Sequence, residues 1–337
     1  MIGTGGIGSG AFFALEGDHT LGREESRGGR FLDRRDYCKL HIISHYVHTL
    51  LGPDFTVLPI GAVGEDDAGK TLLAEMREAG LPLDYVRVLP GEQTLYSFCV
   101  VYPDGSGGNM TTTDSACARV DAAAVRAVEP AFARFADRGI ALAVPEVPLA
   151  ARAEVLRLGT AYGFLRVASF ASAEVEEAWT LLPAVDLLAV NLDEAAAIAG
   201  LQDFDLSVPE IAALACDVLR QRQPALRVSI TAGRAGSWCC DGGTLTHVPA
   251  VPVDAVSTAG AGDAHLSGVL VGLVHGLPLV DAMRLGALTG ALAVTSPHTI
   301  HPDITRATLA RFAAEQGGEG LGIRGSGPSR CTLPRPS

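Results

Sequence analysis

The chain has 337 residues, of which 48% are hydrophobic, and its formal net charge is −12 at pH 7. This length can bury a large core, while the excess of Asp and Glu argues against a broad surface for the phosphate backbone of nucleic acid. The cysteines form no CxxC pair, the N-terminus lacks a basic segment followed by an apolar stretch, and no uncharged apolar run could span a bilayer. We therefore expect a cytoplasmic protein with reduced cysteines and with no nucleic-acid or membrane partner.

Strand-like and helix-like segments alternate along most of the chain. The first pair is a strand at 55–60 and a helix at 72–79, which is expected to stop at Gly80. Further strands are predicted near 140–144, 164–170, 185–190 and 226–231, and helices near 121–134, 149–162, 173–182, 192–200 and 208–222. This order predicts an α/β fold: a doubly wound, mostly parallel sheet with helices on both faces, in one domain over 1–316.

Two segments interrupt the alternation, 11–33 and 93–113. The second alternates through Leu95, Phe98 and Val100 and then turns at 104–108, which predicts a hairpin outside the main sheet. We expect the two segments to form a small β lid over the carboxyl ends of the strands. After residue 316 the composition is rich in Gly, Pro, Arg and Ser, and 317–337 is predicted to be a disordered tail.

Two glycine motifs suggest a phosphate site but have the wrong context. Gly3, Gly5 and Gly8 fit the dinucleotide fingerprint GxGxxG, yet only two residues are available for the strand that must precede it. The segment 64–71 fits the P-loop pattern GxxxxGK[ST], but its three consecutive acids at 65–67 would repel a polyphosphate. Those acids are better explained as favourable charges in the first turn of a helix.

A third glycine-rich run, 257–265, has neither defect. Small residues at 259–262 let backbone amides approach an anion. Leucines and valines then recur at helical spacing, so the amides are expected at a helix N-terminus, where unpaired N–H groups and the macrodipole favour a phosphate. Asp263 could take a proton from an attacking hydroxyl. The run therefore predicts a phosphoryl-transfer site, with a turn capped by Asp263 as the alternative.

Three motifs together resemble the ribokinase-like, or PfkB, carbohydrate kinase family. The sequence STAGAGDAHLSGVL at 257–270 is similar to the family's C-terminal signature. Upstream, 191–194 resembles the family's NxxE motif and 231–236 its TxGxxG nucleotide loop, and the order and spacing agree. The likeness covers most of residues 50–300.

The resemblance implies an ATP-dependent kinase that phosphorylates a hydroxyl of a small sugar or sugar-like molecule. It implies that Asp263 is the general base and that the backbone at Gly260, Ala261, Gly262 and Asp263 forms an anion hole for the transferred phosphoryl group. Phosphoryl transfer depends mainly on positioning and charge neutralisation, which such a site supplies.

The resemblance also implies sites for Mg²⁺ and for the nucleotide. Asn191 and Glu194 are implied to organise Mg²⁺ through water, with a helix cap and a surface acid as the alternative. The implied nucleotide-binding positions are Asn191, Glu194, Thr231, Gly233, Gly236, Thr258 and Ala291. For the loop at 231–236 the alternative is a simple turn after a strand.

The acceptor region departs from the family. Family members usually carry an early Asp and a GGxxxN segment that grip sugar hydroxyls, whereas the comparable regions here are 8–10 and 38–43. Asn109, Thr111 and Thr113 are candidate replacements. A nucleoside kinase and a non-catalytic sugar or nucleotide sensor therefore remain alternatives, as does a nicotinamide-dependent oxidoreductase based on the first glycine motif.

Two further expectations concern partners and metals. The family implies that a lid can double as the interface of a homodimer, so a homodimer through the lid is a possible assembly. His41, His45 and His48 share one face of a predicted helix, but that helix supplies no carboxylate ligand, so we expect a core or surface face there and not a metal site.

Overall fold

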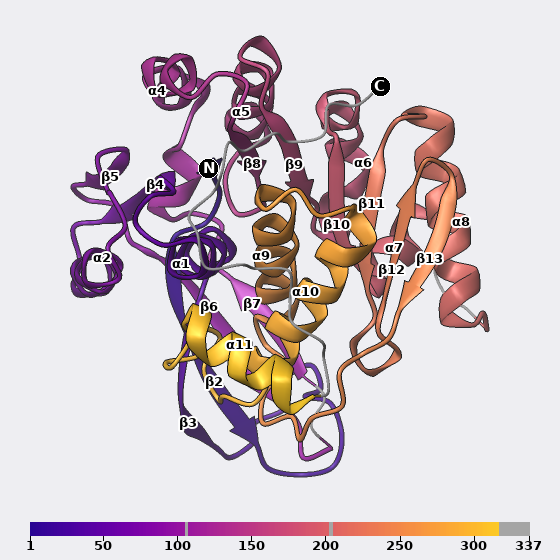
Figure 1. Ribbon diagram of the computed structural model, residues 1–337. Coiled ribbons are helices and arrows are strands. Elements are labelled where there is room, and N and C mark those ends of the chain that lie inside the picture. The colour runs from indigo at the N-terminus through magenta and orange to yellow at the C-terminus, as the bar shows by residue number, and fades with distance from the viewer. Residues whose placement is uncertain (105–106, 202–204, 317–337) are drawn as a thin grey trace.

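Two separate sheets organise the chain. The computed structural model describes residues 1–104, 107–201 and 205–316. In this part of the chain the main sheet has the order β13-β12-β11-β10-β9-β8-β1-β4-β5 (Figure 1). Its strands are β1 (Ile2–Thr4), β4 (Leu58–Gly64), β5 (Val86–Leu89), β8 (Ile140–Ala143), β9 (Leu165–Ser169), β10 (Leu187–Asn191), β11 (Arg227–Thr231), β12 (Ser237–Asp241) and β13 (Thr244–Val248).

The main sheet is parallel from β11 to β5, and at the other edge β12 pairs antiparallel with both β11 and β13. Both of its faces are covered, as the alternation within β10 shows. Leu187 belongs to the hydrophobic cluster that includes residues of α1 (Lys39–Leu51), α9 (Ala261–Val274) and α10 (Leu279–Ala293). Leu188 belongs to the cluster that includes residues of α7 (Leu192–Ile198) and α8 (Val208–Arg222). The predicted fold class, a mostly parallel sheet between two helical layers, is confirmed.

The helices fall where the apolar periodicity placed most of them. They are α1 (Lys39–Leu51), α2 (Asp67–Glu78), α3 (Ala122–Arg126), α4 (Glu129–Arg134), α5 (Leu149–Ala161), α6 (Val175–Ala178), α7 (Leu192–Ile198), α8 (Val208–Arg222), α9 (Ala261–Val274), α10 (Leu279–Ala293) and α11 (Arg306–Glu315). Short 3₁₀ turns occupy Ala116–Arg119, Ser172–Glu174, Trp179–Ala184 and Gly233–Ala235.

Three predicted elements differ from the structure. The strand expected at 55–60 pairs with β1 only from Leu58 and continues to Gly64. The helix expected at 121–134 is divided into α3 and α4, because Pro130 has no amide to continue α3 and instead lies in the first turn of α4. The helix expected at 173–182 is a short α6 between two 3₁₀ turns, the second of which contains Pro183.

The second sheet lies apart from the first, and its strands β2 and β3 extend to the lower end of the molecule in Figure 1. It consists of β2 (Gly8–Leu15), β3 (Gly29–Tyr37), β6 (Leu95–Val101) and β7 (Gly107–Thr111), in the order β3-β2-β6-β7. The two segments from which a lid was expected thus supply its two hairpins. Residues 105–106, at the predicted turn, and the predicted tail at 317–337 lie outside the described residues.

The two faces of this second sheet differ in the polarity of their side chains. On one face Phe13 packs against Phe31 and Phe98, with ring centroids 5.1 and 5.7 Å away. The strand register puts Phe12, Ser97 and Cys99 on the opposite face, where Phe12 is buried. The apolar outer face and the more polar inner face follow from this alternation.

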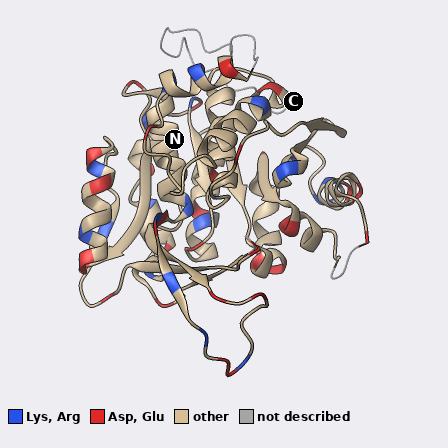
Figure 2. Cartoon of the chain, turned by 90° about the horizontal axis from the view of Figure 1, so that it is seen from below, with Lys and Arg blue, Asp and Glu red and all other residues tan. Residues whose placement is uncertain are grey.

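Charged side chains are spread over the whole molecule. Figure 2 shows Lys and Arg interspersed with Asp and Glu along the helices and loops. Within the described ranges, no helix is both long enough and apolar enough to cross a membrane.

Candidate active site

The predicted motifs meet at the carboxyl ends of the central parallel strands. Asn191 ends β10 and Thr231 ends β11, and the two residues are paired in the register of these neighbouring strands. A Cβ atom placed on Gly262 would lie 3.9 Å from Thr231 Oγ1, so the start of α9 adjoins the end of β11. This edge of an open α/β sheet is where ligands characteristically bind.

The N-terminus of α9 requires glycine at its first position. Gly260 is the N-cap with φ of 75°, a left-handed conformation, and a Cβ atom there would lie 2.8 Å from the carbonyl oxygen of Thr299. The Ala261 amide donates to the Thr258 carbonyl at 3.2 Å, so one amide of the predicted anion hole is already engaged. The amides of Gly262 and Asp263 lie in the first turn, where no acceptor exists within the helix, and they form part of the positive end of the helix dipole.

Asp263 lies in the first turn of α9 and is bound by a lysine from another helix. Its Oδ1 atom is 3.3 Å from Lys39 Nζ, and its side chain is 15% exposed. The hydroxyl of Ser267 donates to the Asp263 backbone carbonyl at 2.7 Å, which ties the first turn of α9 to the second. The carboxylate is therefore held beside the amides that were predicted to bind the phosphoryl group.

Asn191 and Glu194 form a reciprocal cap at the start of α7. Asn191 Oδ1 accepts from the Glu194 amide and Glu194 Oε2 accepts from the Asn191 amide, both at 2.8 Å. Glu194 is only 7% exposed, so the alternative of a surface acid is wrong, although the cap itself is present. Burial raises the pKa of Glu194, and the ammonium of Lys39 opposes that shift.

Glu146 is a site residue that sequence reasoning missed. It follows β8 with φ of 77°, a conformation that side-chain-bearing residues rarely adopt, and among the described residues its buried Oε2 atom has no hydrogen-bond partner. Burial raises the pKa of this carboxyl to about 7, while Lys39 acts in the opposite direction. In the sequence, the feature that could have indicated Glu146 is its position just after the strand predicted near 140–144, between Pro145 and Val147.

Asp36 is the second site residue that the sequence motifs did not indicate. Residues 8–10 contain no carboxylate, but Asp36 lies beside them on the next strand. Gly10 on β2 is paired with Asp36 on β3, and a Cβ atom on Gly10 would lie 2.4 Å from Asp36 Oδ2. Ser97 Oγ donates to the same oxygen at 2.5 Å. Burial raises the pKa of Asp36, and the Ser97 hydroxyl opposes the shift. A buried carboxylate on β3 thus lies beside Gly10 of β2.

The predicted acceptor residues divide into two groups. Thr111 is paired with Ser97 and Asn109 with Cys99, so both lie on the inner face of the second sheet, the face that carries Asp36. Cys99 Sγ is 3.8 Å from Asn109 Oδ1. Thr113 follows the end of β7 and is exposed.

The proposed nucleotide loop turns sharply after β11. Gly233 has φ of 54° and faces open space, whereas Gly236 has φ of 93° and a Cβ atom there would lie 2.4 Å from the Val248 carbonyl oxygen. Gly236 is therefore required by packing, while Gly233 leaves room beside the loop. Thr258 is exposed just before α9, and Ala291 is buried on α10, which packs against β12 and β13.

The P-loop motif does not form a phosphate cradle. Asp66 caps α2 by accepting from the Gly69 amide at 2.8 Å and from the Thr94 amide at 2.7 Å. A carboxylate thus occupies the position at which a phosphate would have to bind. The acids of this segment are a cap and a first-turn charge, as expected from their place at the start of a helix.

The remaining sequence motifs are structural. The GxGxxG match leads into strand β2 and not into a helix, which removes the dinucleotide interpretation. His41 is buried in α1 and packs edge-on against Tyr37, with ring centroids 4.5 Å apart. The residues that the structure describes hold no cluster of three or more His, Cys, Asp or Glu suited to a metal.

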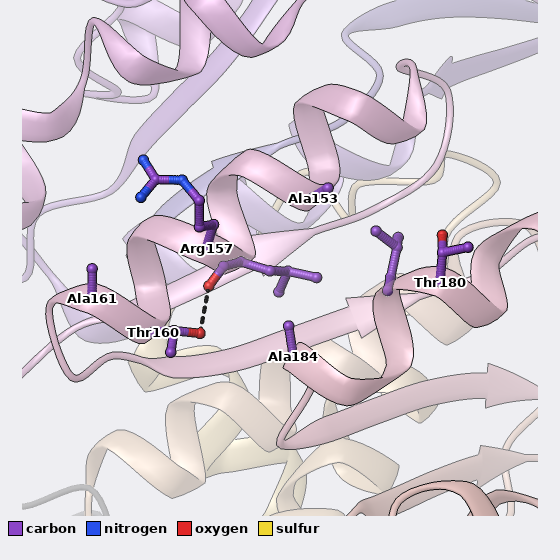
Figure 3. A pocket seen from close by; sticks show the side chains of 8 residues that line it. Ala153, Arg157, Thr160, Ala161, Thr180 and Ala184 are labelled. Atoms are coloured by element: carbon purple, nitrogen blue, oxygen red, sulfur yellow. Dashed lines mark hydrogen bonds between the residues drawn. The ribbon is translucent and has the colours of Figure 1, made fainter.

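A surface pocket elsewhere lies between α5 and the 3₁₀ turn at Trp179–Ala184 (Figure 3). It has a volume of about 390 Å³ and is lined by Ala153, Leu156, Arg157, Thr160, Ala161, Thr180, Leu181 and Ala184. The guanidinium of Arg157 is bound to Glu154, and none of the site residues described above lines the pocket. Its predominantly apolar lining lacks groups suited to phosphoryl transfer.

The chain is similar in sequence to known sugar kinases. Its sequence is 36% identical over 121 residues to a fructokinase of Klebsiella pneumoniae, covering 34% of this chain and 37% of that protein. It is 26% identical over 242 residues to the ribokinase of Schizosaccharomyces pombe, covering 72% of this chain and 74% of the ribokinase. The chain thus spans little more than a third of the first of these relatives and about three quarters of the second.

A solved structure shows the same fold. The ribokinase of Cryptococcus neoformans in complex with ADP matches with a TM-score of 0.76 at 19% identity, covering 92% of this chain and 98% of that one. The model of the pfkB family carbohydrate kinases matches residues 46–306, which is most of the chain and includes β10, β11 and α9. The chain therefore belongs to the pfkB family of carbohydrate kinases.

Proposed function

We propose that the protein transfers the γ-phosphoryl group of ATP to a hydroxyl of a small sugar or sugar-like molecule. The observation that carries the proposal is the placement of Asp263 in the first turn of α9, beside first-turn amides and next to the ends of β10 and β11. Family membership supports the same chemistry. A base and an anion site on one helical turn meet the needs of phosphoryl transfer.

In the proposed step the acceptor oxygen forms a bond to the γ-phosphorus while the bond from that phosphorus to the β,γ-bridging oxygen breaks. The acceptor proton passes to the carboxylate of Asp263, and ADP leaves with the bridging oxygen. The amides of Gly262 and Asp263 donate to the phosphoryl oxygens. Ala261 can join them once its amide exchanges the Thr258 carbonyl for the phosphoryl group.

The residues at the start of α7 fit a magnesium ion held through water. Glu194 is a buried carboxylate with one oxygen engaged by the Asn191 amide, which leaves its second oxygen as an acceptor for a metal-bound water. Asn191 would fix the direction of that carboxylate through the reciprocal cap. The ion would supply charge neutralisation for the ATP phosphates.

The acceptor is expected to be a polyol held by carboxylates and by the inner face of the second sheet. Asp36 and Glu146 can each accept hydrogen bonds from hydroxyl groups, and Asn109 and Thr111 offer further polar contacts. We propose that the sheet acts as a lid that excludes water from the reacting groups. The nucleotide would contact the loop at 231–236, together with Thr258 and Ala291.

The exposed outer face of the lid is the proposed homodimer interface. Phe31 is 68% exposed and packs against Phe13 and Phe98, and Met110 is 61% exposed and is paired with Phe98 in the register of β6 and β7. An exposed apolar cluster of this kind typically marks an interaction surface.

A screen of ATP consumption over sugars, sugar phosphates and nucleosides tests the reaction and its acceptor. Asp263→Asn should lower turnover by roughly 10²–10⁴ with little change in nucleotide affinity, because the amide side chain cannot take the proton. Near-normal turnover of that variant would refute the general-base role. Turnover of nucleosides alone would identify a nucleoside kinase, and ATP binding without product across the whole panel would favour a sensor.

A further inference from the structure

Thr299 lies between the second sheet and the first turn of α9. It belongs to the loop that joins α10 to α11, and it is only 1% exposed. A Cβ atom placed on Gly260 would lie 2.8 Å from the Thr299 carbonyl oxygen, 2.9 Å from its Cβ and 3.2 Å from its Cα. Because Gly260 is the N-cap of α9, Thr299 packs directly against the backbone from which the first-turn amides begin.

On its other side Thr299 is hydrogen-bonded to strand β3. Its amide donates to the Arg35 carbonyl at 3.1 Å, and its hydroxyl accepts from the Tyr37 amide at 3.0 Å. The Arg35 amide donates to Nδ1 of His298 at 2.9 Å. Successive residues of a strand direct their backbone groups to opposite edges, so Asp36 pairs with β2 while its two neighbours bind the loop. The loop thus covers the edge of the second sheet that β3 would otherwise leave open.

The loop around Thr299 is itself anchored on both sides of this contact. The His301 amide donates to the phenol oxygen of Tyr46, a fully buried residue of α1, at 3.0 Å. The carbonyl of Val294, at the end of α10, accepts from the amides at 256–257 at 2.8 and 3.3 Å. Those amides belong to the segment that leads into α9. Thr299 is therefore held at a fixed place between β3 and the start of that helix.

We propose that Thr299 is a positioning residue that keeps the strand carrying Asp36 in register with the anion-binding turn of α9. The inference rests on the proposed function, in which Asp36 holds the acceptor and the first-turn amides bind the phosphoryl group. Transfer requires the attacking oxygen and the phosphorus to be held at a fixed separation, and a displacement of about 1 Å can lower the rate roughly 10²-fold. A hydrogen-bonded link from the strand to the turn maintains that separation.

Three variants test the link. Thr299→Val keeps the branched shape of the side chain and the backbone bond but removes the hydroxyl that accepts from Tyr37. Thr299→Ser keeps this hydroxyl and loses only the methyl group. Thr289→Val is the matched control, because it removes an equally buried hydroxyl whose hydrogen bond, 2.8 Å to the Leu285 carbonyl, lies within α10.

Amide hydrogen exchange of the protein without ligand measures the link independently of turnover. The Tyr37 amide reports on β3, and the Ala264 amide, which donates to the Gly260 carbonyl at 2.9 Å, reports on the first turn of α9. In Thr299→Val both amides should exchange roughly tenfold faster or more, because one bond is lost and the turn loses its support. In Thr299→Ser and Thr289→Val both should stay within about twofold of the wild-type rates.

A fourth variant keeps the test available if Thr299→Val does not fold. His298→Ala removes the acceptor of the Arg35 amide from a half-buried side chain, and it should give the same paired increase in exchange with a smaller magnitude. Faster exchange in β3 with unchanged exchange at Ala264, in either variant, would overturn the role of Thr299.

Turnover with an identified acceptor then separates positioning from stability. Thr299→Val should lower kcat per folded enzyme roughly 10–100-fold with the KM for ATP within about threefold of wild type, and Thr299→Ser should recover most of the loss. A merely structural role would lower the stability of Thr299→Val and leave its kcat equal to that of Thr289→Val.

The outcomes distinguish this inference from the proposed function. Exchange that is not linked between β3 and α9 rejects the role of Thr299 even in an active kinase. Linked exchange in a wild-type protein that consumes no ATP with any acceptor supports the connection through Thr299 and rejects the proposed function.

Discussion

Replacing Gly260 with alanine should destabilise the protein strongly. The backbone at this position has φ of 75°, which costs a residue with a Cβ atom roughly 1–2 kcal/mol. The new Cβ would also lie 2.8 Å from the Thr299 carbonyl oxygen and 2.9 Å from Thr299 Cβ, too close for an ordinary contact. Relieving such overpacking typically costs about 1–3 kcal/mol.

The cost cannot be avoided by a small shift, because Thr299 is fixed by the second sheet. Its amide donates to the Arg35 carbonyl at 3.1 Å, and its hydroxyl accepts from the Tyr37 amide at 3.0 Å. Any movement of Thr299 away from the new methyl group would disturb these bonds to β3. Adding the conformational and packing contributions gives an expected loss of roughly 2–5 kcal/mol in the free energy of unfolding.

Gly262→Ala is the matched control, two residues away in the same turn. A Cβ atom there would meet only Thr231 Oγ1, at 3.9 Å, and the backbone is helical, so alanine should be neutral or stabilise by up to about 1 kcal/mol. Guanidinium unfolding followed by tryptophan fluorescence compares the two variants. If Gly260→Ala unfolds at the same denaturant concentration as Gly262→Ala, the reasoning from backbone conformation and close packing is refuted.

Three further perturbations give distinct expectations. Glu146 has a pKa of about 7 in the folded protein, above its ordinary value of 4.5, so its ionisation destabilises the fold as pH rises between these values. Glu146→Gln should therefore raise the free energy of unfolding by on the order of 2–3 kcal/mol at pH 8 and leave it unchanged at pH 4. Denaturant unfolding at both pH values measures this difference, and an equal effect at the two pH values would contradict the raised pKa. Lys70→Ala should leave ATP affinity unchanged in calorimetric titration, because Lys70 forms an ion pair with exposed Asp67 at the surface, and a tenfold loss would restore the P-loop interpretation. Phe31→Glu should shift a lid-mediated dimer toward monomer in analytical ultracentrifugation, with Val88→Glu as the exposed apolar control on β5; equal behaviour of both variants would argue against the lid interface.

The sequence by itself predicted the architecture because the central strands and their helices each have a recognisable local pattern of apolar residues. Strands β8 to β11 and helices α5 and α8 lie within a few residues of their predicted ranges, since apolar runs and 3.6-residue periodicity depend on neighbours along the chain. The glycine run at 257–265 was likewise sufficient to predict a helix N-terminus at α9. The helices predicted at 121–134 and 173–182 are shorter in the structure, where Pro130 starts a new helix and Pro183 lies in a 3₁₀ turn.

Only the tertiary structure decided which charges share the site. Asp36 reaches Gly10 through the pairing of two strands, Glu146 is held in place by the loop after β8, and Lys39 meets Asp263 across 224 positions of sequence. None of these contacts has a local sequence period, because each depends on strand register and on the packing of α1 against α9. The sequence thus determined that an amide-rich helix start carries a carboxylate, and the fold determined which charged group contacts that carboxylate.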